Sequence, residues 1–127
     1  MKPSVLFASN SYIDMAKALL PIANLKLGTF QMKRFSNEEL YIQLGTKVDG
    51  AECFVLGSLA PPDTQLFSFF LLCHTLKKEG ASKITAVLPY LAYSRHDKNE
   101  PLKSYNTAFI ANIAKLDIDE YNHIRYP

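Results

Sequence analysis

The amino-acid sequence predicts an α/β fold with a largely parallel sheet flanked by helices. Three short runs, residues 5–8, 53–57 and 84–88, are almost entirely apolar, which is typical of strands that are buried on both faces of a parallel sheet. Segments with helical spacing of apolar residues lie between these runs. Strands that alternate with helices along the chain favour parallel pairing.

The first predicted strand, residues 5–8, ends at a polar Ser-Asn-Ser segment that is typical of a helix start. A helix is predicted over about residues 12–20, where Ile13, Ala16, Leu19 and Leu20 recur at helical spacing. Pro21 is predicted to weaken or end this helix, because proline lacks the backbone N–H that a helix interior requires.

A strand pair is predicted next. Residues 28–34 and 41–44 alternate between apolar and polar side chains, and Gly45 closes the second strand. A polar loop with one aromatic residue, 35–39, separates them. The second buried strand, 53–57, follows.

The longest predicted helix covers residues 65–78. Two prolines lead into it, and Asp63 is expected to cap it. Because the helix is apolar almost all round, we expect it to be buried on two sides or to pack against another subunit. Gly80 is expected to end it.

After the third buried strand, 84–88, the pattern predicts a polar loop from residue 89 to about residue 103. A helix over 107–114 and a last strand over 121–126 are predicted to follow. No internal repeat or linker interrupts the chain, so residues 1–127 are expected to form one domain.

The composition is that of a globular protein, with 48% hydrophobic and 20% charged residues. Fourteen basic and twelve acidic residues give a net charge of +2, which is too small to indicate nucleic acid or a membrane as a partner. The longest apolar run, 69–73, is too short to span a bilayer. Two cysteines are too few for a disulfide framework, so we expect a reduced, cytoplasmic protein.

Two loops follow predicted strands at the sheet edge where α/β proteins bind ligands. In loop 35–39, Phe35 could stack on a base, a contact worth about 1–3 kcal/mol. Loop 89–98 contains Arg95 and Lys98, which suit a phosphate chain, together with His96 and Asp97. Polar loops of this kind are more often simply solvated.

Both loops carry a resemblance to a known family. Residues 34–39, RFSNEE, are similar to the Arg-Phe-Ser-(Asp/Asn)-x-Glu motif of ribose-phosphate pyrophosphokinases. Residues 84–98, ITAVLPYLAYSRHDK, resemble that family's longer motif Ile-Thr-Ala-Val-(Ile/Leu)-Pro-Tyr-x-x-Tyr-Ala-Arg-Gln-Asp-(Arg/Lys). The spacing between the motifs also matches, and the resemblance covers nearly the whole chain.

The resemblance implies an enzyme that moves a pyrophosphoryl group from Mg-ATP to ribose 5-phosphate, forming phosphoribosyl pyrophosphate and AMP. Each subunit in the family has two α/β halves of the phosphoribosyltransferase type and assembles into a homo-oligomer, at least a dimer. The 127 residues match the ATP-binding amino-terminal half. The half that holds ribose 5-phosphate is expected to be absent.

The resemblance also implies roles for six residues. Phe35, supplied to a neighbouring subunit, would stack on adenine, and Asn37 and Glu39 would form hydrogen bonds to the base. Arg95 would contact the nucleotide from the other side, where a cation–π contact is favourable. The same pocket would be lined by His96 and Asp97. No catalytic residue and no metal ligand is assigned, because Mg²⁺ is expected to arrive bound to ATP.

Three departures from the family pattern are visible. His96 replaces a glutamine, and residues 98–103 carry fewer basic side chains than the family's loop over the phosphates. The family's next strand ends in Asp-Leu-His. Here Pro127 aligns with that histidine, whereas His123 comes four residues early, within or before the strand. We therefore expect this chain alone to be inactive.

Two alternatives stay open: a non-catalytic interaction module that pairs with a full-length synthetase through residues 65–78 and 35–39, and a different phosphoribosyltransferase-like or sugar-phosphate-binding domain. A metal site formed by His96, Asp97 and His123 is disfavoured, because their spacing matches no known ligand pattern. His74 is expected to be a packed or interface residue. Cys53 and Cys73 are expected in the core.

Overall fold

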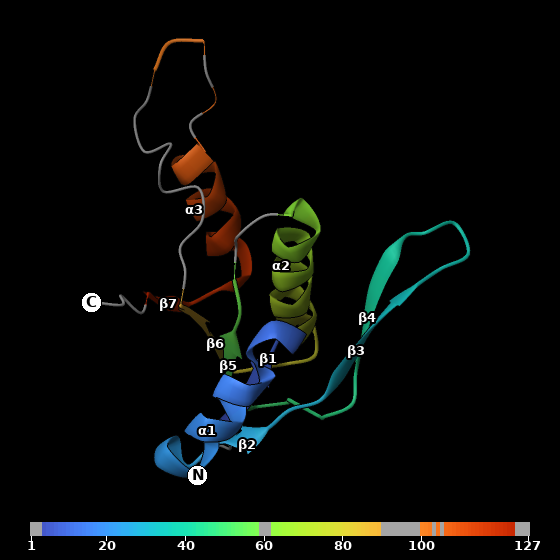
Figure 1. The fold of residues 1–127 in the computed structure, drawn as a ribbon, viewed down its shortest axis with the longest axis vertical. Coiled ribbons are helices and arrows are strands. Elements are labelled where there is room, and N and C mark those ends of the chain that lie inside the picture. Colours follow the sequence, from blue (N-terminus) through green and yellow to red (C-terminus); the bar gives the residue numbers. More distant parts are fainter. Residues whose placement is uncertain (1–3, 59–61, 90–99, 103, 105, 124–127) are drawn as a thin grey trace.

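A computed structural model describes residues 4–58, 62–89, 100–102, 104 and 106–123 of the chain. Within these residues, five strands form one parallel sheet in the order β2-β1-β5-β6-β7, and β3 and β4 form a separate antiparallel hairpin (Figure 1). The strands are β1 Ser4–Ala8, β2 Lys26–Leu27, β3 Phe30–Arg34, β4 Leu40–Leu44, β5 Glu52–Leu56, β6 Lys83–Leu88 and β7 Glu120–His123. The helices are α1 Ile13–Ala23, α2 Asp63–Lys78 and α3 Asn106–Asp117, with a short 3₁₀ turn, Asn10–Tyr12, before α1. The predicted fold class is confirmed.

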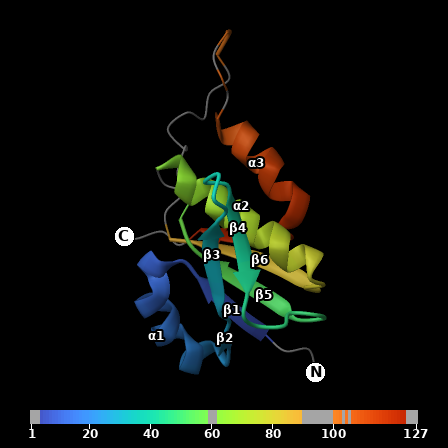
Figure 2. The same cartoon turned by 90° about the vertical axis from the view of Figure 1, so that its right-hand side faces the viewer.

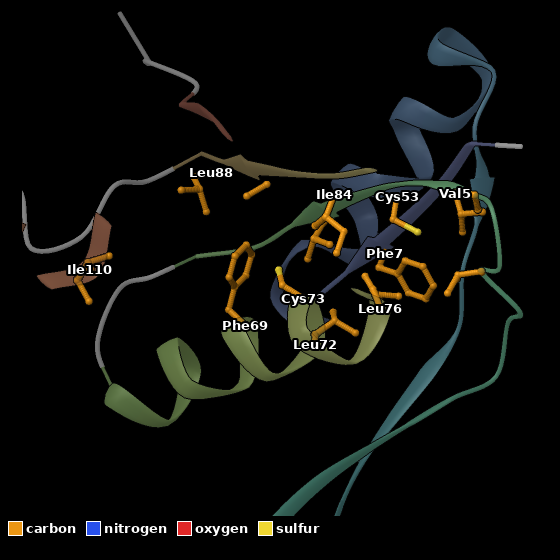
Figure 3. Packing of buried hydrophobic residues seen from close by; sticks show 14 residues of the cluster. Val5, Phe7, Cys53, Phe69, Leu72, Cys73, Leu76, Ile84, Leu88 and Ile110 are labelled. Atoms are coloured by element: carbon orange, nitrogen blue, oxygen red, sulfur yellow. The ribbon is translucent and has the colours of Figure 1, made fainter. Parts of the chain in front are cut away.

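The sheet separates two hydrophobic cores. Side chains of successive strand residues point to opposite faces, so in β1 Val5 and Phe7 enter the α2 core, whereas Leu6 and Ala8 enter the α1 core. From α2, Phe69, Leu72, Cys73 and Leu76 point toward the sheet (Figure 3). The central strands are therefore covered on both faces, as their apolar sequences predicted.

Helices α2 and α3 are joined by polar contacts that include His74. Helix α3 packs beside α2 on the same side of the sheet (Figures 1 and 2). His74 of α2 was expected to be a packed or interface residue; it is not packed in the core, since its side chain is 64% exposed and its Nδ1 lies 3.3 Å from Asp117 of α3. Lys77 donates a hydrogen bond of 2.9 Å to the carbonyl of Leu116, close to the end of α3. Polar contacts at the surface thus join the two helices.

Pro21 was predicted to weaken or end helix α1; the helix continues past Pro21 to Ala23, so Pro21 does not end it. Proline removes only one backbone hydrogen bond, and it does so here in the last turn of the helix, on an exposed side. The helix ends instead at Asn24, which adopts a left-handed conformation with φ 53°. Its backbone N–H, like that of Leu25, donates to the carbonyl of Leu20, as in common helix terminations.

Two further boundaries differ from the sequence prediction, and one strand was not predicted. The cap of α2 is Pro62, and Asp63 is the first helical residue, where a carboxylate suits the helix dipole. Strand β3 begins at Phe30 rather than at residue 28. Gly28 lies so close to the sheet that a Cβ atom there would come within 2.5 Å of the Phe7 ring. The short strand β2, which pairs with β1, was not predicted.

The remaining elements agree with prediction within a few residues. Gly80, with φ 96°, follows the end of α2. Helix α3 extends three residues beyond the predicted end at residue 114. Strand β7 contains His123, which pairs with Leu88, so this residue lies within the strand, as predicted. Residues 124–126, the end of the predicted last strand, lie outside the described residues. None of the helices in the described residues is long and apolar enough to cross a membrane.

Helix α2 offers a direct test of this core. Leu76 is fully buried between α2 and the sheet, whereas Phe67 of the same helix is 57% exposed. We expect Leu76→Ala to lower the free energy of unfolding by about 2–5 kcal/mol, because it removes buried methyl groups and leaves a cavity. Phe67→Ala should change it by less than about 1 kcal/mol. Urea denaturation measures both values, and equal losses would contradict the packing of α2 described here.

Candidate functional site

A cavity of about 540 Å³ lies at the carboxyl ends of β1 and β5. In the five-stranded sheet the chain passes from β1 outward to β2 on one side, and from β5 outward to β6 and β7 on the other side. The boundary between β1 and β5 is therefore the topological switch point of the sheet. Open α/β sheets bind ligands in the crevice outside this point. The cavity is lined on one side by polar groups that follow β1 and β5 and by the first turns of α2, namely Ser9, Asn10, Ser11, Ser58, Thr64, Gln65 and Ser68.

The inner face of the β3–β4 hairpin forms the opposite side of this cavity. Its register pairs Met32 with Ile42 and Arg34 with Leu40, and Met32, Arg34 and Leu40 line the cavity. Sequence reasoning missed the contribution of residues 9–11, which it treated only as a helix start. The switch-point rule, applied to the first and second buried strands, would have identified them.

The loop at the tip of the hairpin, Phe35–Glu39, brings together three of the six residues that the sequence singled out (Figure 1). The N–H of Phe35 donates to the carbonyl of Glu39, and the N–H of Glu38 donates to the carbonyl of Phe35, both at 2.9 Å. A tight turn closed in this way, followed by a left-handed residue, is a common three-residue hairpin loop. Phe35, Asn37 and Glu39 are therefore presented together in a small, hydrogen-bonded loop.

Asn37 contributes to the shape of this loop. Its Oδ1 accepts a hydrogen bond of 3.1 Å from the backbone N–H of Glu39, an arrangement in which asparagine stabilises a turn. The side-chain NH₂ group of Asn37 is then the donor that it can offer to a ligand. The expected hydrogen bond from Asn37 to a base can be donated by this group without disturbing the turn.

Phe35 has one ring face covered and remains half-exposed. Its ring stacks on that of Tyr41 in β4, with centroids 4.4 Å apart and an interplanar angle of 23°. The side chain of Phe35 is 54% exposed. Tyr41 pairs in register with Lys33, so by strand alternation it lies on the hairpin face opposite to Arg34 and Leu40. The aromatic pair is therefore on the outer face of the hairpin, away from the switch-point cavity.

Glu38 adopts a left-handed conformation with φ 73°. This region is unfavourable for residues with a Cβ atom and is usually occupied by glycine in such loops. Arg34 stabilises the strained residue by donating a hydrogen bond of 2.6 Å from its guanidinium group to the carbonyl of Glu38. Arg34 thus connects the cavity face of the hairpin to the tip loop.

The other three predicted residues, Arg95, His96 and Asp97, lie outside the described residues, as does Lys98. These four residues belong to the segment between Pro89, which directly follows β6, and Glu100. Strand β6 is parallel to β5, so its carboxyl end lies at the same edge of the sheet as the switch-point cavity.

Metal ligands and reactive thiols are not grouped at this edge in the part of the chain that the structure describes. No set of three or more His, Cys, Asp or Glu side chains there could hold a metal ion. Burial raises the pKa of the Cys53 thiol to about 11 and also raises the pKa of Cys73, with a smaller contribution from the charge of Asp117. Both cysteines belong to the hydrophobic core, as predicted, and their raised pKa values disfavour the reactive thiolate.

Comparison with known proteins gives one consistent result. A family model described as the N-terminal domain of ribose phosphate pyrophosphokinase matches residues 4–116. The ribose-phosphate pyrophosphokinase of Agrobacterium fabrum is 30% identical over 110 residues, which are 85% of this chain and 36% of the relative. A putative ribose-phosphate pyrophosphokinase 2 of Lactiplantibacillus plantarum is 32% identical over 114 residues, which are 88% of this chain and 36% of the relative. The chain thus spans about a third of the length of these curated relatives.

Solved structures agree on the fold. A phosphoribosylpyrophosphate synthetase from Mycobacterium smegmatis superposes with a TM-score of 0.82 at 23% identity, covering 98% of this chain and 49% of that protein. A hypoxanthine phosphoribosyltransferase from Staphylococcus aureus superposes with a TM-score of 0.55 at 12% identity, covering 98% of this chain and 65% of that protein. The phosphoribosyltransferase-like architecture expected from the sequence is confirmed.

The strain at Glu38 can be measured. We expect Glu38→Gly to raise the free energy of unfolding by about 0.5–1 kcal/mol, because glycine adopts a positive φ without the steric cost of a Cβ atom. Ser36→Gly, in the same loop but without a positive φ, is the control and should leave stability unchanged or lower it. Urea midpoints at constant m-value compare the variants. A lower midpoint for Glu38→Gly would show that the left-handed residue is not strained.

Proposed function

The chain belongs to the ribose-phosphate pyrophosphokinase family, matching that family's amino-terminal domain, and we propose that it is the ATP-binding part of a ribose-phosphate diphosphokinase. The intact reaction would convert ATP and ribose 5-phosphate to phosphoribosyl pyrophosphate and AMP. One observation carries the proposal: the hairpin tip presents Phe35 half-exposed beside Asn37 and Glu39, in the loop that resembles the family's adenine-binding motif.

The chemistry expected of this part is binding rather than bond breaking. Phe35 would stack on adenine, and Glu39 and the NH₂ group of Asn37 would form hydrogen bonds to its edge. Arg95, His96 and Asp97, from the loop after β6, would complete the nucleotide pocket. Mg²⁺, bound to the phosphates of ATP, would neutralise charge that develops during phosphoryl transfer. Positioning the nucleotide is the contribution proposed for this chain.

The hairpin geometry supports a role for a second subunit. Phe35 and Tyr41 lie on the hairpin face opposite to the residues that line the switch-point cavity of the same chain. A base stacked on the exposed face of Phe35 would therefore lie outside this cavity. This arrangement fits the proposal that loop 35–39 serves the nucleotide site of a neighbouring subunit in a homo-oligomer, at least a dimer.

Titration calorimetry with Mg-ATP tests the nucleotide site. We expect saturable binding that Phe35→Ala weakens about 5- to 150-fold, the equivalent of about 1–3 kcal/mol of base–aromatic stacking. Ile22→Ala is the control, because Ile22 is also a large exposed apolar side chain, 82% exposed, but lies near the end of α1, and this variant should bind Mg-ATP as the unchanged chain does. The oligomeric state is measured in the same buffer.

The absence of Mg-ATP binding by a folded oligomer would refute this proposal. It would then favour the non-catalytic interaction module, which predicts co-purification with a full-length synthetase instead.

Catalysis by the 127-residue chain alone is a separate question. The relatives are almost three times as long as the matched region, which is 36% of their length, and the family resemblance assigns the ribose 5-phosphate loop to the other half. We therefore expect no measurable phosphoribosyl pyrophosphate when the chain is incubated with Mg-ATP and ribose 5-phosphate. Formation of that product, detected by chromatography together with AMP, would show that residues 1–127 contain a complete active site.

A further inference from the structure

We propose that Tyr41 is a positioning residue that holds the ring of Phe35 as a preformed platform for the base of the nucleotide. The inference rests on the proposed function, since it concerns how the same site achieves its affinity. The motif at residues 34–39 does not include Tyr41, which lies in β4 beyond the loop.

The contact between the two rings is an offset stack rather than incidental proximity. The centroids are 4.4 Å apart and the planes are inclined by 23°, within the range in which aromatic pairs attract each other. Tyr41 itself is only partly exposed, whereas Phe35 is 54% exposed. One face of the Phe35 ring is therefore covered by Tyr41, and the area that remains accessible includes the opposite face.

Phe35 needs such support because of where it lies. It follows the last residue of β3, at the tip of a two-stranded hairpin, and every residue from 31 to 39 is exposed. Isolated two-stranded hairpins are only marginally stable in water. A solvent-exposed phenylalanine at such a tip would sample several rotamers, and binding a base would then require that freedom to be lost.

The two strands are joined on the outer face beside Tyr41. Strand pairing places it opposite Lys33, and Lys33 donates a hydrogen bond of 3.0 Å from its Nζ to Oε1 of Gln43, two residues further along β4. This contact joins the two strands next to the aromatic pair. The resulting order of layers is Tyr41, then Phe35, then the base, so Tyr41 does not touch the nucleotide itself.

The expected loss of Mg-ATP affinity equals the cost of immobilising one side chain, that of Phe35. Removing the ring of Tyr41 while keeping an apolar side chain, as in Tyr41→Leu, should weaken Mg-ATP binding about two- to tenfold. Tyr41→Phe keeps the stack and should bind as the unchanged chain does. Gln31→Leu is the control, because it places a new leucine on the same outer face of the hairpin without changing the aromatic pair. Gln31 lies two residues before Lys33 in β3, so it faces the same side but lies further from the tip.

Calorimetric titration of these variants of the 127-residue chain tests the inference, with Mg-ATP and Mg-tripolyphosphate as the two probes. Tripolyphosphate has no base, so loss of a stacking platform should leave its affinity unchanged, whereas general disruption of the hairpin would reduce binding of both probes. Amide cross-peaks of β3 and β4 in NMR spectra show whether the hairpin is still formed. A double variant, Phe35→Ala with Tyr41→Leu, should bind Mg-ATP no more weakly than Phe35→Ala, because Tyr41 acts through Phe35.

The outcomes separate the inference from the proposed function. If the unchanged chain binds Mg-ATP but Tyr41→Leu binds it equally well, or loses both probes in parallel, the positioning role is wrong and the proposed function stands. If Tyr41→Leu weakens binding further in the Phe35→Ala background, Tyr41 contacts the ligand directly and the layered arrangement is wrong. If the unchanged chain does not bind Mg-ATP, the proposed function fails and this inference fails with it.

Discussion

Burial of the central strands on both faces is the constraint on which the rest of this structure depends. In β1 and β5 alternate side chains enter two different cores, so neither strand can carry a polar side chain along its length without burying it. The polar residues of this region therefore lie at the first positions of these strands or beyond their carboxyl ends. Because the strands are parallel, Ser9 and Ser58 meet at one edge of the sheet. The switch-point cavity is thus a consequence of how the core is built.

The β3–β4 hairpin is not buried on both faces, because only its base packs against the core. Phe30, Ile42 and Leu44 pack against the α2 core, whereas the strands beyond them extend away from the sheet (Figure 1). The tip must be stabilised by its own contacts, which include the backbone hydrogen bonds that close the loop, the hydrogen bond from Arg34 to Glu38, the turn formed by Asn37 and the stack of Phe35 on Tyr41. These contacts hold Glu38 in its left-handed conformation, whose strain is tolerated where the surrounding structure fixes it.

Sequence patterns predicted the elements that burial specifies and missed those that depend on tertiary contacts. The three buried strands and α2 follow from apolar runs. Strand β2 is too short to show alternation and exists because β1 offers it an open edge. His74 lies in an apolar segment, yet it faces solvent and Asp117, since helical position rather than sequence neighbourhood decides exposure. For the proposed site, the sequence predicted Phe35, Asn37 and Glu39, which share the hairpin tip, and Arg95, His96 and Asp97, which lie outside the described residues. It did not identify Tyr41, because a stack across a hairpin depends on strand register.

Register connects the base of the hairpin to its tip. Side chains alternate between the two faces of a strand, so a shift of one residue would exchange the inner and outer faces. The pairing of Phe30 with Leu44 at the base fixes the pairing of Lys33 with Tyr41 near the tip. Burial of apolar side chains at one end of the hairpin therefore determines that Tyr41 points outward at the other end, where it meets Phe35. The hydrophobic core thus sets the orientation of the aromatic pair, although neither ring lies in that core.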